Sequence, residues 1–307
     1  MITVFGSLNV DYIFHVNHLP QPGQTLLASD LAILPGGKGG NQALAAAKAG
    51  AEVRMVGATG RDGLGQIALA GLQANGVNTA HVVQVDQATG TASINVDAAG
   101  ENTIVVFSGA NGAVSHTHLD GGGLDDTTIL LLQFEVPVTA MEKAIGLAKT
   151  AGAKVIWNLA PMGAVTLTLL KNIDYLLVNE GELTELCSAL GLSDAGEYGL
   201  NNIDRITAVA EQTDQSIVVT LGAQGCLAYH QKRLISVPAL AITPIDTVGA
   251  GDAFAGAFAA ALDQDEAFEM ALKWGNVAGA LACMQPGAQS ALPTRTQILD
   301  RLPDLAS

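Results

Sequence analysis

The sequence predicts a doubly wound α/β fold, a mostly parallel sheet with helices on both faces, together with a small antiparallel β lid. Three observations lead to this prediction. Short apolar runs that suit buried strands alternate with stretches whose apolar residues recur every three or four positions. Two turn-rich segments interrupt this alternation. Of the 307 residues, 49% are hydrophobic, which is enough for a large core. Alternating strands and helices are typical of parallel sheets covered on both faces.

The strand candidates are almost uniformly apolar, as strands buried on both faces must be. Strands are expected at residues 2–6, 53–58, 128–134, 154–159, 175–178 and 217–221. Helices are expected at residues 41–49, 65–74, 138–151, 182–190 and 203–212, and from residue 252 onward. Asn41 is expected to cap the first helix, because asparagine suits an N-cap and an Ala-rich run follows. A ligand should bind beyond the carboxyl ends of the strands.

Residues 11–34 and 89–107 are the two segments that interrupt the alternation of strands and helices. The first contains short β-like runs around LPQPGQT, and the second alternates on both sides of a Gly-containing turn. We expect them to form one discontinuous lid on a single domain spanning residues 1–307, because no linker or repeat divides the chain.

Charge limits the classes of partner that we expect, and cysteine content indicates the cellular compartment. The formal charge is −15, from 29 acidic and 14 basic residues. Such a field repels phosphate backbones and anionic lipid, so neither nucleic acid nor a membrane is an expected partner. The three cysteines are far apart and form no CxxC pair, which indicates reduced thiols in a cytoplasmic protein. The first residues also lack a signal-peptide pattern.

The stretch DTVGAGDAFAGAF, residues 246–258, places a carboxylate among small residues where a strand gives way to a helix. Gly249, Ala250 and Gly251 let backbone amides approach a ligand, and the helix end adds positive potential. Asp252 could simply stabilise the first turn of that helix, by about 0.3–1 kcal/mol. A carboxylate beside an anion hole is also what phosphoryl transfer to a hydroxyl requires. The amides stabilise the migrating group, and the carboxylate accepts the alcohol proton.

Two further clusters suit a polyhydroxy ligand. Glycines surround Lys38 in LPGGKGGNQ, although a flexible loop with a solvated lysine would look the same, and the Walker pattern is absent. In GSLNVDY, Asn9 and Asp11 point to one side of an extended strand and could bond sugar hydroxyls. Turn formation is the alternative explanation for this pair.

Weaker signals come from single polar residues at strand ends. Glu135 follows a buried strand at the ligand end of the sheet. Asn179 and Glu182 span a strand end and a helix start, a spacing that a capping box would also explain. Thr220 begins a tight turn in VVTLGAQGCL that could be an ordinary hairpin.

These motifs resemble those of the ribokinase family of carbohydrate kinases, also called the PfkB family. DTVGAGDAFAGAF is similar to the family's carboxyl-side signature, and GGKGGNQALAAAKAG followed by VGATGRDGLG is similar to its amino-side signature. Order and spacing agree over essentially the whole chain. The resemblance implies a ribokinase-like fold and ATP-dependent phosphorylation of a sugar. It also implies use of Mg²⁺ and K⁺, and a homodimer formed through the lid.

The resemblance also implies a role for each matching position. It assigns Asp252 as the catalytic base, with Gly249, Ala250 and Gly251 as the anion hole. The sugar-contacting positions are Asn9, Asp11, Gly37, Lys38, Asn41, Glu135 and Asp252. The nucleotide-side positions are Asn179, Thr220, Gly222, Gly225, Gly251 and Asn276. Glu182 corresponds to Mg²⁺ placement through water, and Asp246, with the backbone near Ala282 and Gly287, corresponds to a monovalent-cation loop.

Three departures from the family pattern concern the cation loop and the nucleotide side. Gln285 stands where the family often has arginine, and Ala291 where it often has serine, which weakens the expectation of potassium binding. Residues 158–162 read NLAPM rather than the usual NPAP, which alters the nucleotide-side wall.

The function that accounts for these features together is transfer of the γ-phosphoryl group of ATP to the O5 hydroxyl of D-ribose. Fructose, a sugar acid or a nucleoside are alternative acceptors. Binding a sugar acid would require a further cationic side chain, and the lid has almost none. Binding a nucleoside would require an aromatic side chain to stack on its base, and Tyr12 and Phe14 are candidates. An NAD-dependent oxidoreductase is disfavoured because GxGxxG is missing. A non-catalytic sugar-binding regulator is disfavoured because Asp252 and its anion turn are intact.

Overall fold

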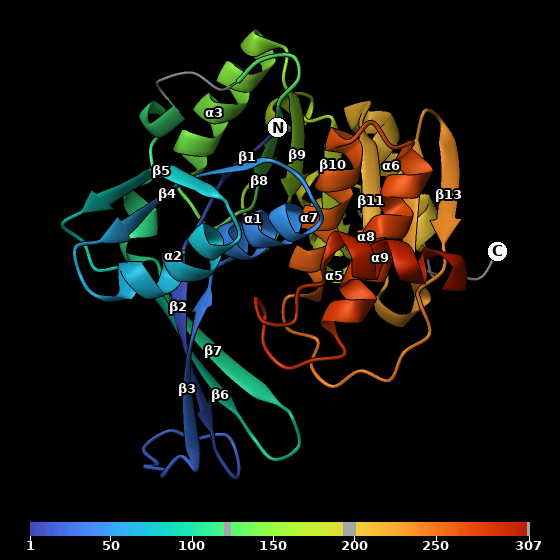
Figure 1. Ribbon diagram of the computed structural model, residues 1–307. Helices are drawn as coiled ribbons and strands as arrows, with labels where there is room; N and C mark the ends of the chain where they lie inside the picture. Colours follow the sequence, from blue (N-terminus) through green and yellow to red (C-terminus); the bar gives the residue numbers. More distant parts are fainter. Residues whose placement is uncertain (120–123, 193–200, 306–307) are drawn as a thin grey trace.

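The main sheet runs through the centre of the molecule. The structure is a computed structural model that describes residues 1–119, 124–192 and 201–305. Within these residues the main sheet has the strand order β13-β12-β11-β10-β9-β8-β1-β4-β5 (Figure 1). Its parallel strands are β1 (Ile2–Phe5), β4 (Val53–Gly60), β5 (Asn78–Val85), β8 (Ile129–Leu132), β9 (Lys154–Asn158), β10 (Tyr175–Asn179) and β11 (Ser216–Thr220). Two antiparallel strands, β12 (Cys226–His230) and β13 (Arg233–Val237), complete one edge.

Helices cover both faces of this sheet, which confirms the predicted fold class (Figure 1). The helices are α1 (Lys38–Lys48), α2 (Leu64–Ala74), α3 (Val138–Ala151), α4 (Leu167–Leu170), α5 (Glu180–Ala189), α6 (Asn202–Thr213), α7 (Ala250–Asp263), α8 (Phe268–Ala282) and α9 (Arg295–Arg301). No helix in the described ranges is long and apolar enough to cross a membrane.

Two hydrophobic clusters, one on each face, explain why the strands read as continuous apolar runs. On β8, Ile129 and Leu131 join the cluster that includes α1, α7 and α8, whereas Leu130 and Leu132 join the cluster that includes α3, α5 and α6. Successive side chains of a strand point to opposite faces, so both sets must be apolar. Each strand therefore anchors two layers of helices at once.

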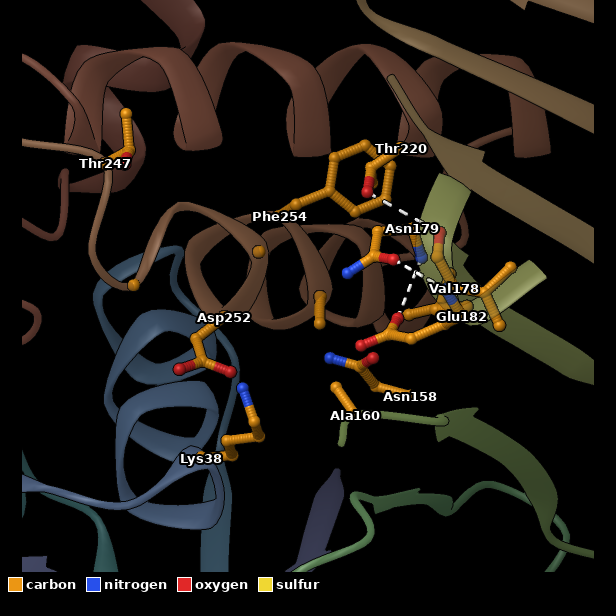
Figure 2. A pocket seen from close by; sticks show the side chains of 14 residues that line it. Lys38, Asn158, Ala160, Val178, Asn179, Glu182, Thr220, Thr247, Asp252 and Phe254 are labelled. Atoms are coloured by element: carbon orange, nitrogen blue, oxygen red, sulfur yellow. Dashed lines mark hydrogen bonds between the residues drawn. The ribbon is translucent and has the colours of Figure 1, made fainter. Parts of the chain in front are cut away.

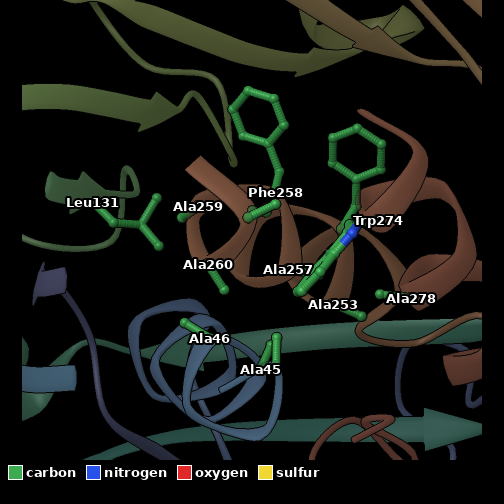
Figure 3. Close-up of a cluster of buried hydrophobic side chains, with 14 of the residues drawn as sticks. Ala45, Ala46, Leu131, Ala253, Ala257, Phe258, Ala259, Ala260, Trp274 and Ala278 are labelled. Carbon is green, nitrogen blue, oxygen red and sulfur yellow. The ribbon is translucent and has the colours of Figure 1, made fainter. Parts of the chain in front are cut away.

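Helices α1 and α7 pack unusually close together through small residues (Figure 3). A Cβ atom at Gly256 of α7 would lie 2.5 Å from Ala45 Cβ and 2.7 Å from the Gln42 carbonyl oxygen of α1. Only glycine fits there without moving a helix. This contact sets the middle of α7 against α1, one turn beyond Asp252.

The start of α1 differs from the prediction. The helix begins at Lys38 with Gly37 as its N-cap, so Asn41 lies inside the first turn and its amide donates to the Gly37 carbonyl at 2.9 Å. Gly37 has a φ of 84°, a conformation that favours glycine. The backbone turn at glycine therefore decides where the helix starts, and the Asn41 side chain is free for another contact.

The lid is a second sheet with the order β3-β2-β6-β7, and it extends away from the body (Figure 1). Its strands are β2 (Asn9–His15), β3 (Asp30–Gly36), β6 (Gly90–Val96) and β7 (Asn102–Phe107). The outer pairings are antiparallel as expected, but β2 and β6 pair in parallel, so the purely antiparallel sheet was wrong. The chain enters the lid twice, and both times its outgoing strand lies in the centre.

Candidate active site

Asp252 lies in the first turn of α7, where the helix meets the lid-side end of α1. Its side chain is only 6% exposed. Asn41 Nδ2 donates to Oδ2 at 2.9 Å, and Gln42 Nε2 donates to Oδ1 at 2.8 Å. A buried carboxylate needs such donors. The contact explains why the Asn41 side chain does not cap its own helix.

The backbone before Asp252 makes the turn that the small residues predict. Gly249 is the N-cap of α7 with a φ of 77°, which favours glycine. The Ala250 amide donates to the Thr247 carbonyl at a long 3.3 Å, so it is partly occupied. Among the residues that the structure describes, the Gly251 amide has no backbone acceptor. The turn therefore leaves amide donors beside the carboxylate, where an anion could accept them.

A polar cavity of about 240 Å³ opens directly against Asp252. Lys38, Asn179 and Glu182 point into it from different elements (Figure 2). Thr220, Gly249 and Gly251 also lie on its wall. The cavity brings a lysine, amide donors and two carboxylates to one place at the carboxyl ends of the parallel strands.

A second, mostly apolar cavity of about 440 Å³ continues from the first. Thr220, Thr247, Gly251 and Phe254 line both cavities. Gly222, Gly225 and Asn276 lie on the wall of the second, with Leu240, Ile242 and Ala280. The turn of η3 (Gly222–Gln224) leads into the hairpin of β11 and β12, so the hairpin interpretation of this segment also holds.

On the lid side, Asn9 and Asp11 share one face of β2, as their alternation predicts. Asn111 Nδ2 donates to Asn9 Oδ1 at 2.7 Å, and Asn111 also bonds both backbone polar groups of Leu8. The Asp11 carboxylate lies against Gly36, where any Cβ atom would overlap it. Asn9 is therefore positioned by Asn111 of the body, and Asp11 packs against the neighbouring lid strand β3.

Glu135 ties the first strand to the start of α1. Its Oε2 accepts from Ser7 Oγ at 2.5 Å and from the Lys38 amide at 2.9 Å. Ser7 Oγ in turn accepts from the Gly39 amide at 3.2 Å. Glu135 thus fixes the glycine loop that presents Lys38 to the cavity.

The carboxylates shift one another's ionisation. Burial, together with the charges of Glu135 and Asp252, raises the pKa of Asp11 to about 6. The charge of Asp252 raises the pKa of Lys38, so the lysine stays protonated despite burial. Burial raises the pKa of Glu182. The site thus holds one fixed cation among acidic groups.

Glu182 and Asn179 form the capping box that their spacing allows. Asn179 Oδ1 accepts from the Glu182 amide, and Glu182 Oε2 accepts from the Asn179 amide, both at 2.8 Å. Glu182 nevertheless borders the cavity. Within the described residues no group of three or more His, Cys, Asp or Glu side chains could hold a metal directly. Any divalent ion here would need oxygens from phosphate or water, which is how Mg²⁺ usually binds.

Asp246 organises the loop near the end of α8. Its Oδ1 accepts from the Val248 amide at 3.0 Å and its Oδ2 from the Gly287 amide at 2.8 Å. Ala282 is buried as the last residue of α8, and the next carbonyl, of Cys283, accepts from the Ile245 and Asp246 amides. The structure thus brings Asp246, in the loop before α7, next to Gly287, in the loop after α8.

Sequence reasoning missed several residues of the site. Phe254 and Ala255 line the cavity because they share a helix face with Gly251 at spacings of three and four. Asn158 also points into it from the end of β9, at the start of the segment 158–162 whose departure from NPAP was expected to alter the nucleotide-side wall (Figure 2). The Gln42 contact could not be inferred, because it joins residues 210 positions apart.

A buried carboxylate beside helix amides and a lysine, in a polar cavity that continues into an apolar one, defines a phosphotransferase with an alcohol as acceptor. Comparison with known proteins narrows this class. The family described as pfkB family carbohydrate kinase matches residues 1–295. The chain is 33% identical over 304 residues to a ribokinase of Haemophilus influenzae, covering 98% of each chain.

Two further relatives are equally well covered. The chain is 33% identical over 309 residues to a deoxyribokinase of Salmonella typhimurium, with 98% of each covered. A solved structure of Arabidopsis thaliana ribokinase complexed with ribose and ATP superposes with a TM-score of 0.85 at 29% identity, covering 98% of each chain. The chain belongs to the pfkB family of carbohydrate kinases.

Proposed function

We propose that the chain transfers the γ-phosphoryl group of ATP to the O5 hydroxyl of D-ribose, with Asp252 as the base. The observation that carries this proposal is the buried Asp252 carboxylate beside the open Gly251 amide. The sugar binds between lid and body against Asn9 and Asp11. ATP lies along the two connected cavities, with its base in the apolar one and its phosphates in the polar one.

The residues contribute mainly by position and charge. The Lys38 ammonium and the Gly251 amide stabilise negative charge on the migrating phosphoryl group, and Gly249 shapes the turn. An aspartate is a weak base toward an alcohol, so Asp252 accepts the proton as the new P–O bond forms. The O5–H and γ-phosphoryl–ADP bonds break, and the O5–P bond forms. Closure of the lid would exclude water from this step.

We propose that Mg²⁺ enters with ATP near Glu182 and Asn179 through bridging waters. The Oε1 atom of Glu182 is the side-chain oxygen that the capping box leaves available. A potassium site in the loop of Asp246, Ala282 and Gly287 remains a further proposal. Gln285 and Ala291 argue for weak affinity. The thiols of Cys187, Cys226 and Cys283 fit a cytoplasmic enzyme.

Ribose is favoured over 2-deoxyribose by the hydrogen-bond acceptors where the lid meets the body, one on the lid strand β2 and one after the body strand β8. Asp11 and Glu135 both face the sugar region, and a site built to bond a hydroxyl discriminates against an analogue that lacks it. Deoxyribose stays the second candidate, because a deoxyribokinase is as similar to the chain as the ribokinase is.

The test is ATP consumption with ribose, 2-deoxyribose, fructose, a sugar acid and a nucleoside, each with and without potassium and with EDTA. We expect the highest kcat/KM for ribose, loss of turnover in EDTA and only weak activation by potassium. Turnover of the nucleoside alone would contradict the proposal.

A further inference from the structure

Asp252 is the centre of a buried chain of side-chain amides. On one side Gln133 Nε2 donates to Gln42 Oε1 at 2.8 Å, and Gln42 Nε2 donates to Asp252 Oδ1 at 2.8 Å. On the other side Gln289 Nε2 donates to Asn41 Oδ1 at 3.1 Å, and Asn41 Nδ2 donates to Asp252 Oδ2 at 2.9 Å. Gln42 and Gln133 are fully buried. Every donor in the chain therefore points inward, toward the carboxylate.

The charge of Asp252 dictates this direction. An ionised carboxylate only accepts hydrogen bonds, so the carboxamide of Gln42 must turn its NH₂ group toward it. The Gln42 oxygen then faces Gln133, which must donate in turn. A flipped Gln133 would place two amide oxygens against each other. The position of one amide thus fixes the orientation of the next.

Forming this series of hydrogen bonds leaves polar atoms unpaired at its two outer ends. Gln133 Oε1 and Gln289 Oε1 are buried and have no hydrogen-bond partner among the described residues. An unpaired buried amide oxygen is costly, so a network built only for stability would not leave two of them. Both unpaired oxygens lie away from Asp252, and both donors lie toward it. The arrangement therefore supplies hydrogen bonds to the Asp252 carboxylate and leaves the oxygens of the two outermost glutamines unpaired.

We propose that Gln42, oriented by Gln133, is a positioning residue that fixes Asp252 Oδ1 and so aims the carboxylate at the acceptor hydroxyl. This inference rests on the proposed function. Gln42 does not line either cavity and so has no contact with substrate of its own. It acts through Asp252, and Gln133 acts through Gln42.

The test compares kcat and KM of Gln42→Met, Gln133→Met and the double variant Gln42→Met/Gln133→Met. Methionine is unbranched and close to glutamine in length, so the core stays filled. For Gln42→Met we expect kcat to fall about 10- to 100-fold, as for a lost hydrogen bond to a charged group, with both KM values within about threefold. Gln133→Met should lose less. In the double variant, which leaves no unpaired donor, kcat should stay as low as in Gln42→Met.

A second background separates positioning from general damage. If Gln42 acts through Asp252, Gln42→Met lowers kcat in the wild-type background but adds no loss to Asp252→Asn. Losses that multiply would overturn the inference, as would Gln42→Met with near-normal kcat. Thr213→Val is the matched control, because Thr213 is buried and hydrogen-bonded on α6, outside both cavities. It should lower stability without lowering kcat, and an equal loss of kcat in this control would also overturn the inference.

The wild-type measurement tells the two proposals apart. If the unaltered chain turns over a sugar and the Gln42 variants match it, the positioning role fails while the proposed function stands. If the unaltered chain turns over none of the acceptors, the proposed function fails, and the inference fails with it.

Discussion

At the scale of single residues, the site depends on where charges are held. Asp252 is fixed by two amides, Glu135 fixes the loop that carries Lys38, and Asn111 fixes Asn9. In each case a neighbour that does not react holds a residue assigned to the reaction. Pre-set orientation of this kind supplies much of the rate in phosphoryl transfer, because the protein does little covalent chemistry there.

Replacing the proposed base should separate turnover from binding. We expect Asp252→Asn to lower kcat at least about 100-fold, because no group remains to accept the alcohol proton, while ribose still binds. Steady-state kinetics and calorimetric titration with ribose measure the two effects. Glu269→Gln is the matched control, because it removes a first-turn carboxylate from α8. Near-normal turnover in Asp252→Asn would leave Asp252 as only a helix-stabilising residue.

The raised pKa of Asp11 predicts weaker sugar binding in acid. Above about pH 7 the side chain is ionised and accepts hydrogen bonds from sugar hydroxyls. As the pH falls through about 6, Asp11 takes up a proton and that form loses an acceptor. The Kd for ribose should then rise toward tenfold per pH unit. Titration calorimetry between pH 5 and 8 measures this, and Asp11→Asn should flatten the curve. An unchanged slope in that variant would assign the effect to another group.

At the scale of elements, local sequence patterns predicted much of the fold. They did not predict the contacts between residues far apart in the sequence. Apolar runs revealed the central strands, because both faces of these strands are buried. The edge strand β5 alternates exposed and half-buried residues, so no continuous run marked it. The start of α1 was misplaced because the prediction rested on the capping preference of Asn41, whereas the backbone turn at Gly37 sets the start. The strand-end rule predicted a ligand site where the polar cavity lies, but the amide network around Asp252 joins segments from four parts of the chain.

The α1–α7 contact predicts an unusual response to added helix propensity. Gly256→Ala should destabilise the fold by about 1–3 kcal/mol and lower kcat, because the new Cβ would overlap Ala45 and push Asp252 away from α1. Gly146→Ala, in exposed α3 with nothing within 4 Å of the added atom, should instead stabilise by about 0.5–1 kcal/mol. Urea unfolding measures both. If the two variants shift stability alike, packing does not restrict position 256.

At the scale of the whole molecule, the lid supplies an apolar surface that the body does not cover. Strand register puts Ile13, Ile94 and Ile104 side by side on the face that carries Asp11. The opposite face places Ser93 and Asn95 of the central strand β6 between its exposed apolar side chains, which include Leu31, Ile33, Val105 and Phe107. An apolar face on a protein with a charge of −15 suits a second copy of the chain, because burial there brings little like charge together.

We therefore predict a dimer formed through the Asp11 face of the lid. Ile104 is 54% exposed on this face, and its neighbour Val105 is 70% exposed on the other. Ile104→Lys should give a monomer at micromolar concentration, whereas Val105→Lys should leave the dimer intact. Analytical ultracentrifugation distinguishes the two. A monomeric wild type, or equal effects of both variants, would count against this interface.

The separation of Gln42 and Asp252 along the chain has a consequence for biosynthesis. The proposed base and the amide proposed to position it are 210 residues apart, and Gln133 and Gln289 come from still other segments. In a nascent chain the lid strands therefore leave the ribosome long before Asp252, the proposed base. We expect phosphoryl transfer only after residue 252 and the amides that bond it have all been synthesised and folded together.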